Sequence, residues 1–299
     1  MLLTILVTML AIVGIGFLSW LLRAAMKASQ LGLKAEPLVL GAATNFFDTL
    51  GIGSFAPTLA WMRFRKIVPD RLIPMTMIAG YTPPSIVQAI IFMILLGVNV
   101  DPVLLVGSAI AIVLGAVIGA PIAARSPVRA IQLIVAGALL MAAFFYSLAN
   151  LGLMPVGGAA NTLPIPLMLV AIAASFIFGI LTNFGVGNYA PTLAMLSLFG
   201  MDPRLAFPIM AFGASCAGTA ASVRLIKLMD VDLRIVLSLV AGAIPAVLVA
   251  AFVVKEMPVT TLRWLVVAVV LYTAVSLIYA ALQKPLGAPE EQLGKAMAS

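Results

Sequence analysis

Long apolar runs dominate the chain, and they predict helices that cross a membrane. An α-helix rises about 1.5 Å per residue, so a run of about 20 apolar residues spans the roughly 30 Å hydrocarbon layer of a bilayer. Polar positions fall mainly between the runs, as loops would. The full-length runs are Met1–Leu22, Leu72–Leu96, Pro102–Ala124, Val128–Ala149, Pro164–Phe184, Leu205–Ile226, Ile235–Val254 and Thr261–Leu282.

Three further apolar stretches are too short to cross. They are Pro37–Phe47, Phe55–Arg63 and Asn188–Phe199, and all three flank glycine-rich breaks. About 11 or 12 helical residues reach only about 18 Å. We therefore expect half-helices whose broken ends lie inside the membrane, where non-helical backbone is tolerated only when it packs against protein or lines a cavity.

The two breaks are copies of one motif. Residues 51–60 read GIGSFAPTLA, and residues 185–194 read GVGNYAPTLA. Just upstream, GAATNF at 41–46 matches GILTNF at 179–184, and the first copy carries four extra residues, 47–50, between the two blocks. A match this long indicates an internal duplication, and interrupted segments at corresponding positions of two halves are typical of a transporter site.

The composition excludes a water-soluble globule, because 64% of the residues are hydrophobic and only 9% are charged. The formal net charge of +7 comes from basic loops, which favour the cytoplasmic side of a membrane rather than nucleic acid. Arg204, Lys255 and Arg263 are the exceptions that would face outward. This assignment places the N-terminus outside and the C-terminus in the cytoplasm.

The same assignment gives the two broken pairs opposite orientations. The pair at Pro37–Arg63 begins and ends inside, and the pair at Pro164–Phe199 begins and ends outside. The predicted fold is an all-α, polytopic transmembrane helical bundle of two inverted-topology repeats with broken or re-entrant helices, plus an extra N-terminal helix. The expected parts are an N-terminal helix and basic loop (1–35), repeat 1 (36–149), an external loop (150–162), repeat 2 (163–282) and a cytoplasmic tail (283–299).

The broken tips carry the candidate binding groups. Half-helices that begin near Ser54 and Asn188 offer free backbone N–H groups, and helix N-termini attract anions. Glycines let backbone approach a ligand closely, and hydroxyl and amide side chains add neutral hydrogen bonds. The alternative is that these residues only repair the broken helices. The candidates are Thr44, Asn45, Gly51, Gly53, Ser54, Pro57, Thr58, Thr182, Asn183, Gly185, Gly187, Asn188, Pro191 and Thr192.

Asp48 is the one acid inside a predicted break, which makes it either a proton- or sodium-coupling group or a cap for nearby backbone. Arg224 either reaches inward to a substrate or extends to the membrane interface. Polar residues on two further helices either line a cavity or serve helix packing. These secondary candidates are Tyr81, Gln88, Ser215 and Thr219.

Catalytic chemistry has little support in the sequence. The chain has no histidine, and its one cysteine, Cys216, lies in an apolar run. We therefore expect no metal, no cofactor and no His-based nucleophile. No phosphate-binding loop of the G-x-x-x-x-G-K-[ST] type is present, so the chain is predicted to be a secondary transporter rather than an ATPase or another enzyme.

The doubled glycine-rich break, followed a few positions later by Pro57 or Pro191, resembles the TauE/SafE family of sulfite and organosulfonate exporters over roughly Glu36–Leu282. The resemblance implies a bacterial inner-membrane permease that moves sulfite or short organosulfonates, usually outward. Its partners would be the small anion, membrane lipid, a coupling proton or sodium ion and possible further copies of the chain. A permease for another anion or a cation, and a non-transporting membrane subunit, are the alternatives.

Overall fold

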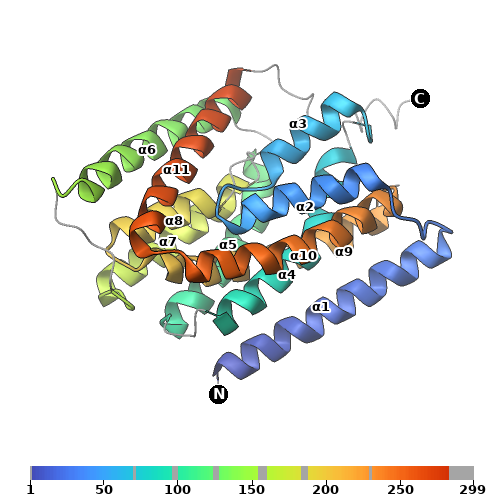
Figure 1. Ribbon diagram of the computed structural model, residues 1–299, viewed down its shortest axis with the longest axis horizontal. Helices are drawn as coiled ribbons and strands as arrows, with labels where there is room; N and C mark the ends of the chain where they lie inside the picture. Colours follow the sequence, from blue (N-terminus) through green and yellow to red (C-terminus); the bar gives the residue numbers. More distant parts are fainter. Residues whose placement is uncertain are drawn as a thin grey trace.

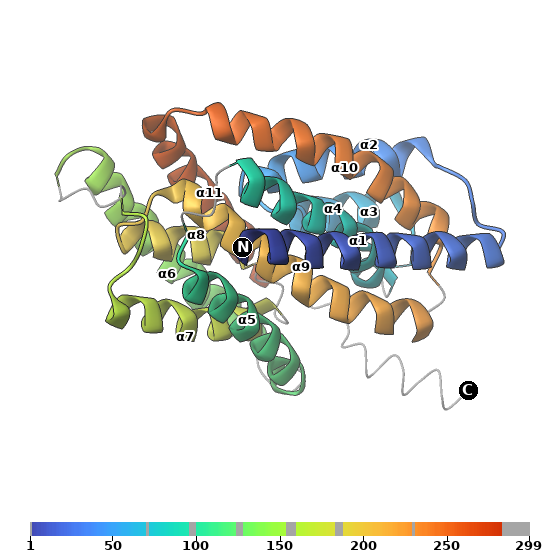
Figure 2. The same ribbon diagram turned by 90° about the horizontal axis from the view of Figure 1, so that it is seen from below.

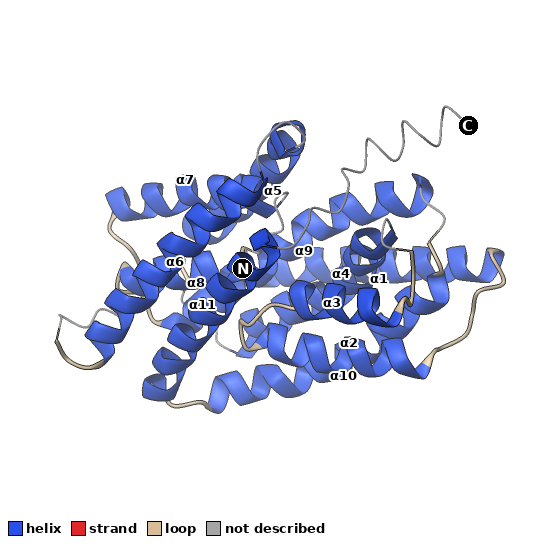
Figure 3. Cartoon of the chain, turned by 90° about the horizontal axis from the view of Figure 1, so that it is seen from above, coloured by secondary structure: helices blue, strands red, loops and turns tan. Residues whose placement is uncertain are grey.

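The computed structural model describes residues 2–69, 72–95, 100–123, 128–153, 160–182, 188–228 and 231–282. These residues form eleven helices and no sheet (Figures 1 and 3). The helices are α1 (Leu2–Lys27), α2 (Ala35–Thr49), α3 (Phe55–Arg65), α4 (Ile73–Leu95), α5 (Pro102–Ala123), α6 (Val128–Asn150), α7 (Ile165–Thr182), α8 (Tyr189–Leu198), α9 (Pro203–Leu228), α10 (Leu233–Glu256) and α11 (Val259–Leu282).

Six of the described helices are long and apolar enough to cross a membrane: α1, α4, α5, α7, α10 and α11. The predicted runs Val128–Ala149 and Leu205–Ile226 are also helical, as α6 and α9. Large apolar side chains face outward, such as Phe64 at 77% exposure and Ile134 at 71%. Such an apolar outer surface suits lipid rather than water.

The three short stretches are short helices, as predicted: α2 and α3 form one hairpin, and α8 forms a second with the longer helix α7. In the first hairpin, Glu36 near the start of α2 accepts hydrogen bonds from Trp61 Nε1 (3.2 Å) and Arg65 Nε (2.8 Å) near the end of α3. Figure 1 shows α2 and α3 side by side, joined by a short loop. That loop turns at Gly51 and Gly53, which have φ values of 96° and 88°. Glycine adopts this left-handed backbone conformation with little steric cost.

The second hairpin consists of α7 and α8. Ala160, ahead of α7, donates its N–H to the carbonyl of Gly200 (3.2 Å) and accepts from the N–H of Asp202 (3.1 Å), both just after α8. The segment just before α7 and the segment just after α8 therefore lie side by side. Residues 183–187, which join α7 to α8, lie outside the described residues.

The two hairpins open at opposite ends of α10, a helix of 24 residues and thus about 36 Å long. Lys34, just before the first hairpin, pairs with Asp232 at the start of α10. Arg204, just after the second hairpin, donates to the carbonyl of Met257 at the other end of α10 (2.7 Å). Residues on these two hairpin bases are consequently about a membrane thickness apart.

Helices of the two halves pack against one another in matched pairs: α2 with α10, α5 with α7, α4 with α9 and α6 with α11 (Figures 1 and 2). Glycines allow two of these pairs to touch backbone to backbone. A Cβ on Gly242 of α10 would overlap the carbonyl of Leu38 on α2, and a Cβ on Gly115 of α5 would overlap the carbonyl of Phe176 on α7. Small residues at such crossings are typical of membrane helices.

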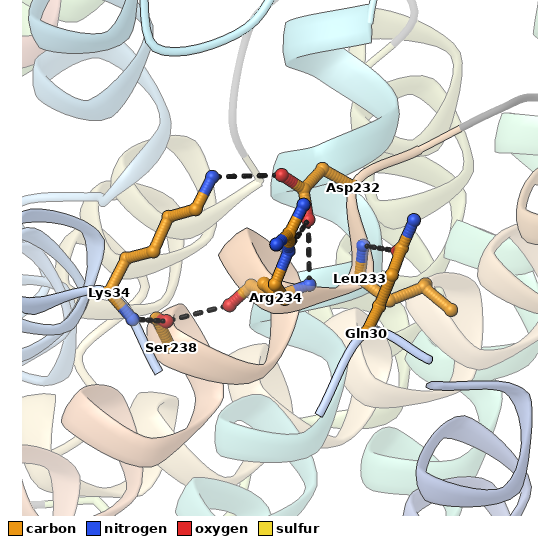
Figure 4. Close-up of polar contacts among 6 residues, drawn as sticks. All are labelled: Gln30, Lys34, Asp232, Leu233, Arg234 and Ser238. Carbon is orange, nitrogen blue, oxygen red and sulfur yellow. Dashed lines mark hydrogen bonds and ion pairs between the residues drawn. The ribbon is translucent and has the colours of Figure 1, made fainter. Parts of the chain in front are cut away.

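The extra N-terminal helix, α1, lies along the side of the bundle and packs mainly against α4. The segment after it is fastened to the start of α10, as Figure 4 shows. Lys34 Nζ lies 2.9 Å from Asp232 Oδ2, the backbone N–H of Lys34 donates to Ser238 Oγ (2.7 Å), and Gln30 accepts from the N–H of Leu233 (2.7 Å). These contacts fix where α2 enters the bundle.

We expect the Asp232 contacts to stabilise the protein in a pH-dependent way. Partial burial acts to raise the pKa of Asp232, but hydrogen bonds from Lys34 and from the Arg234 backbone outweigh it and leave the pKa below its ordinary value. A lowered pKa means that the stabilisation is complete above the ordinary pKa of about 4 and is lost as the pH falls through the lower folded-state value.

Asp232→Asn should therefore lower stability at neutral pH by less than about 1 kcal/mol, the usual range for an exposed pair, and by less still in acid. Thermal unfolding of the detergent-solubilised protein at both pH values measures this. Glu256→Gln is the matched control, because Glu256 is 76% exposed and its only described pairing is the long 3.9 Å contact with Lys255. An equal Asp232→Asn effect at both pH values would contradict the assignment.

Candidate functional site

The tip of the first hairpin contains a buried acid that is tied to backbone. Asp48, in the last turn of α2, accepts the N–H of Ser54 through Oδ1 at 2.7 Å, across the break. Ser54 directly precedes α3, so this carboxylate satisfies one of the free amides at the start of that helix. The capping role that the sequence offered as one alternative for Asp48 is therefore present.

Tyr81 of α4 fastens both helices of the first hairpin. Its hydroxyl oxygen lies 2.9 Å from Thr44 Oγ1 on α2 and 2.6 Å from Thr58 Oγ1 on α3. Thr44 Oγ1 also lies within hydrogen-bonding distance of the carbonyl of Leu40, and Thr58 Oγ1 of the carbonyl of Ser54, so the three hydroxyl protons are shared among four contacts. All three hydroxyls are buried, so the cluster sets the position of the hairpin against α4.

Tyr81→Phe should loosen this hairpin. The substitution keeps the ring but removes a hydroxyl that makes two buried hydrogen bonds, each with a net value of about 0.5–1.5 kcal/mol. We expect the free energy of unfolding to fall by roughly 1–2 kcal/mol, measured by chemical denaturation in detergent. Tyr279→Phe is the control, because Tyr279 is 65% exposed on the outer surface. Equal stability of the two variants would mean that the hydroxyl cluster does not hold the hairpin.

A second polar cluster, at the start of α8, has unused hydrogen-bonding groups. Tyr189 donates its hydroxyl to Gln88 Oε1 on α4 at 3.0 Å. Gln88 Nε2, Asn188 Nδ2 and Thr192 Oγ1 are buried and have no hydrogen-bond partner among the described residues. Leaving a buried polar group unpaired costs about 1–3 kcal/mol, so such groups in a folded protein call for an explanation.

The two clusters face one another. At the tip of the first hairpin, a Cβ on Gly51 would lie 3.4 Å from Leu193 of α8, 3.7 Å from Val269 of α11 and 3.8 Å from Phe207 of α9. The tip of the first hairpin thus lies against the helix that begins at the second break, and α4 contributes a side chain to each cluster.

Several of the other predicted residues occupy the positions that the repeat suggested. Pro57 and Pro191 are each the third residue of their helix, where a missing N–H costs no helical hydrogen bond. Gly51 and Gly53 form the turn between α2 and α3. Asn45 is buried, and its amide donates to the carbonyl of Gly41 on its own helix (3.0 Å).

Other predicted residues bond to carbonyls of their own helices or lie outside the described part of the chain. Thr182 is exposed and donates to the carbonyl of Gly179. Ser215 and Thr219 donate to carbonyls one turn earlier on α9. Asn183, Gly185 and Gly187 lie in the segment that is not described, and for Arg224 only the backbone is described.

Tyr189 is the functional candidate that sequence reasoning missed. It occupies the repeat position of Phe55, and the comparison of the two copies did not single it out. The signal lay in the difference between the copies: a hydroxyl is present in one and absent from the other, and a buried tyrosine hydroxyl usually finds a partner.

The long apolar helices, the apolar outer surface and the buried polar clusters define a multi-pass membrane protein with a polar site in its interior. Residues 167–298 match the model of the sulfite exporter TauE/SafE family, a family of membrane transporters. The resemblance seen in the sequence is thus confirmed for the second half of the chain. No curated protein and no solved structure matches the chain significantly.

Proposed function

We propose that the protein is a secondary transporter that exports small sulfur-containing anions, such as sulfite or short organosulfonates, across the bacterial inner membrane. The substrate binds between the two hairpin tips, midway through the membrane. The observation that carries the proposal is the pair of buried, unpartnered amide N–H groups of Asn188 and Gln88 beside the first tip. An anion with several oxygens supplies the acceptors that these donors lack.

The charge and shape of the site favour an anion. The side chains that it presents are neutral amides and hydroxyls, and α8 begins at the site with the positive end of its dipole. A helix that is interrupted inside the membrane has free backbone N–H and C=O groups at the break, and these groups can bind a substrate, unlike those of an unbroken helix. The family match adds the substrate class, since sulfite is what the matching family is named for.

An inverted duplication accounts best for the packing. Gly41 and Gly179 open the two matching T-N-F blocks, and a Cβ on either would overlap partner backbone, at Leu239 and Ile112 respectively. The same two partners recur on α4 and α9, where a Cβ on Gly80 would meet the side chain of Leu239 and one on Gly213 that of Ile112. Both of these glycine contacts in one half thus have a counterpart in the other.

The opposite openings of the two hairpins support the same proposal, with repeats at 36–149 and 163–282. Lys34, Arg65 and Arg234 gather at the base of the first hairpin, which the excess of basic residues places in the cytoplasm. This orientation puts the N-terminus outside and the tail at 283–299 in the cytoplasm. Both hairpins are then re-entrant, and the tip of the first lies against α8 inside the membrane.

Asp48 is the proposed coupling group, for a proton or a sodium ion. It is buried, it lies at the tip of the first hairpin, and among the described residues no lysine or arginine pairs with it. The same carboxylate also favours the second candidate function, a cation permease, because intramembrane acids often bind cations. Assembly with further copies of the chain stays a prediction.

Flux through proteoliposomes separates these functions. We expect sulfite to cross faster with the protein than without it, a short organosulfonate to compete, and an imposed pH or sodium gradient to change the rate. Cation flux that does not depend on any anion would establish the cation permease instead. Absence of flux for every tested ion, with the protein correctly folded, would favour the non-transporting subunit.

A further inference from the structure

Tyr189 and Gln88 form a buried hydrogen bond between α8 and α4. Tyr189 is the first residue of α8, and its hydroxyl donates to Oε1 of Gln88 at 3.0 Å. The two residues are 8% and 1% exposed. The bond engages the oxygen of the Gln88 amide and leaves the nitrogen, with its two N–H groups, without a hydrogen-bond partner among the described residues. One end of the amide is therefore held, and the other is available to a ligand.

The hydroxyl of Tyr189 determines which end of the amide is held. A tyrosine hydroxyl carries one proton, and a buried hydroxyl needs an acceptor for it. Among the described residues, the recorded acceptor is Oε1 of Gln88. If the amide turned over, its nitrogen would face Tyr189 and the hydroxyl proton would lose this acceptor. Because a buried donor without an acceptor is costly, Tyr189 favours the orientation in which the N–H groups of Gln88 face away from it.

Gln88 lies on the side of α4 that meets the proposed binding site. Phe92, one turn further along α4, packs against Phe207 of α9 with ring centroids 5.1 Å apart. Phe207 in turn lies 3.8 Å from the position of a Cβ on Gly51, at the tip of the first hairpin. Residues four positions apart share one face of a helix. Gln88 is thus on the face of α4 that meets α9 and, through Phe207, the first tip, and it contacts the start of α8 through Tyr189.

The first half of the chain has no counterpart of this bond. Phe55 stands at the repeat position of Tyr189, and Ser222 stands at that of Gln88. Phe55 has no hydroxyl, and its ring makes an edge-on contact with the ring of Tyr81, 6.1 Å between centroids. A plain aromatic ring is therefore sufficient at the start of α3. The hydroxyl of Tyr189 is an addition in one half, and its described contact is the Gln88 amide.

We infer that Tyr189 is a positioning residue that sets the polarity of the binding site, by holding the Gln88 amide with its N–H groups toward the substrate. This inference rests on the proposed function and adds a specificity-determining residue to its site. The held amide offers only donors, which suit the oxygens of an anion and oppose a ligand that must itself donate. Without the Tyr189 hydroxyl the amide can turn over, and its oxygen then repels negative charge.

Two small ligands of nearly equal shape test the orientation of the amide. Methanesulfonate has oxygens that accept hydrogen bonds and no group that donates. Methanesulfonamide is a neutral analogue in which an NH₂ group, which donates, replaces one oxygen. Affinities are measured as ligand-induced thermal stabilisation of the full chain in nanodiscs, for the unmodified protein and for Tyr189→Phe. Tyr279→Phe is the matched control, because Tyr279 is 65% exposed on the outer surface.

Tyr189→Phe should weaken methanesulfonate binding about 2- to 12-fold, which is the affinity equivalent of one hydrogen bond. Methanesulfonamide binding should not weaken, because the turned amide offers an acceptor to the NH₂ group of this ligand. The preference for methanesulfonate over methanesulfonamide should therefore narrow, which a general loosening of the site would not cause. Tyr279→Phe should leave both affinities unchanged.

Gln88→Met is a second variant that leaves Tyr189 in place. Methionine has a similar length but no amide, so methanesulfonate binding should weaken about 10- to 150-fold, the range for a hydrogen bond to a charged partner. Adding Tyr189→Phe to this variant should change the affinity by less than about twofold, because the amide that Tyr189 positions is already absent.

The possible contradictions act at different levels. If Tyr189→Phe weakened both ligands equally, or weakened neither, the inference would be overturned and an anion transporter would remain. The same holds if Gln88→Met bound methanesulfonate like the unmodified protein, or if Tyr189→Phe had its full effect in the Gln88→Met background. Failure of methanesulfonate to bind the unmodified protein would overturn the proposed function, which includes short organosulfonates, and the inference with it.

Discussion

Asn188→Ala should weaken anion binding by roughly 10- to 150-fold. Asn188 directly precedes α8, which begins at the second glycine-rich break. Its amide nitrogen is buried, and no described group accepts a hydrogen bond from it. A hydrogen bond to a charged partner is worth about 1.5–3 kcal/mol, which corresponds to that range of affinity. Asn188→Asp should weaken binding further, because it adds negative charge at the proposed anion site.

Binding to the reconstituted protein, followed by transport in proteoliposomes, measures the effect. Ser175→Ala is the matched control: Ser175 is also buried, but its hydroxyl already donates to the carbonyl of Ala171 on its own helix (2.8 Å). We expect this variant to bind and transport like the unmodified protein. If Asn188→Ala did the same, the break at α8 would be structural, and the anion would bind elsewhere.

Gly242→Ala should destabilise the protein by about 1–3 kcal/mol, the usual cost of forcing a methyl group into a packed interface. The added Cβ would overlap the carbonyl of Leu38, so α2 and α10 would have to separate. Because Gly115 occupies the corresponding place between α5 and α7, Gly115→Ala should cost a similar amount. Chemical denaturation in detergent measures both.

Gly16→Ala is the control for this series. A Cβ at Gly16, on α1, has no atom within 4 Å, so alanine there should be neutral or should stabilise the helix by up to about 1 kcal/mol. Gly242→Ala and Gly115→Ala variants as stable as the Gly16→Ala variant would mean that the backbone contacts between the two halves do not hold the bundle together.

The sequence predicted much of this architecture because its strongest signals are also the strongest physical constraints. A bilayer admits only long apolar helices, so the runs that became α1, α4 and α10 stand out in any reading of the chain. The repeated G-x-G motif marked the ends of the short helices within a few residues, since glycines that turn the chain cannot be replaced without strain. That α2 and α3 form a hairpin followed from the basic residues at both of its ends.

Side-chain partners could not be predicted in the same way. Thr44, Thr58 and Tyr81 each read as plausible site residues, yet they bond to one another, because helix packing in three dimensions brings α2, α3 and α4 together. Tyr189 and Gln88 lie 101 positions apart, and no local pattern links them. Equivalent positions of the two copies can also differ in burial. The side chain of Thr182 is exposed, whereas that of its repeat partner Thr44 is buried.

That one anion binds between the two hairpin tips is tested most directly by locating the bound anion. Crystals of the protein soaked in a bromine-labelled short sulfonate, with anomalous diffraction at the bromine edge, give its position without any assumption about the site. The account predicts one principal peak between Asp48 and Asn188, with the sulfonate oxygens within hydrogen-bonding distance of the amides of Asn188 and Gln88. A principal peak away from this place, on the outer face of the bundle or among the arginines at the base of the first hairpin, would contradict it.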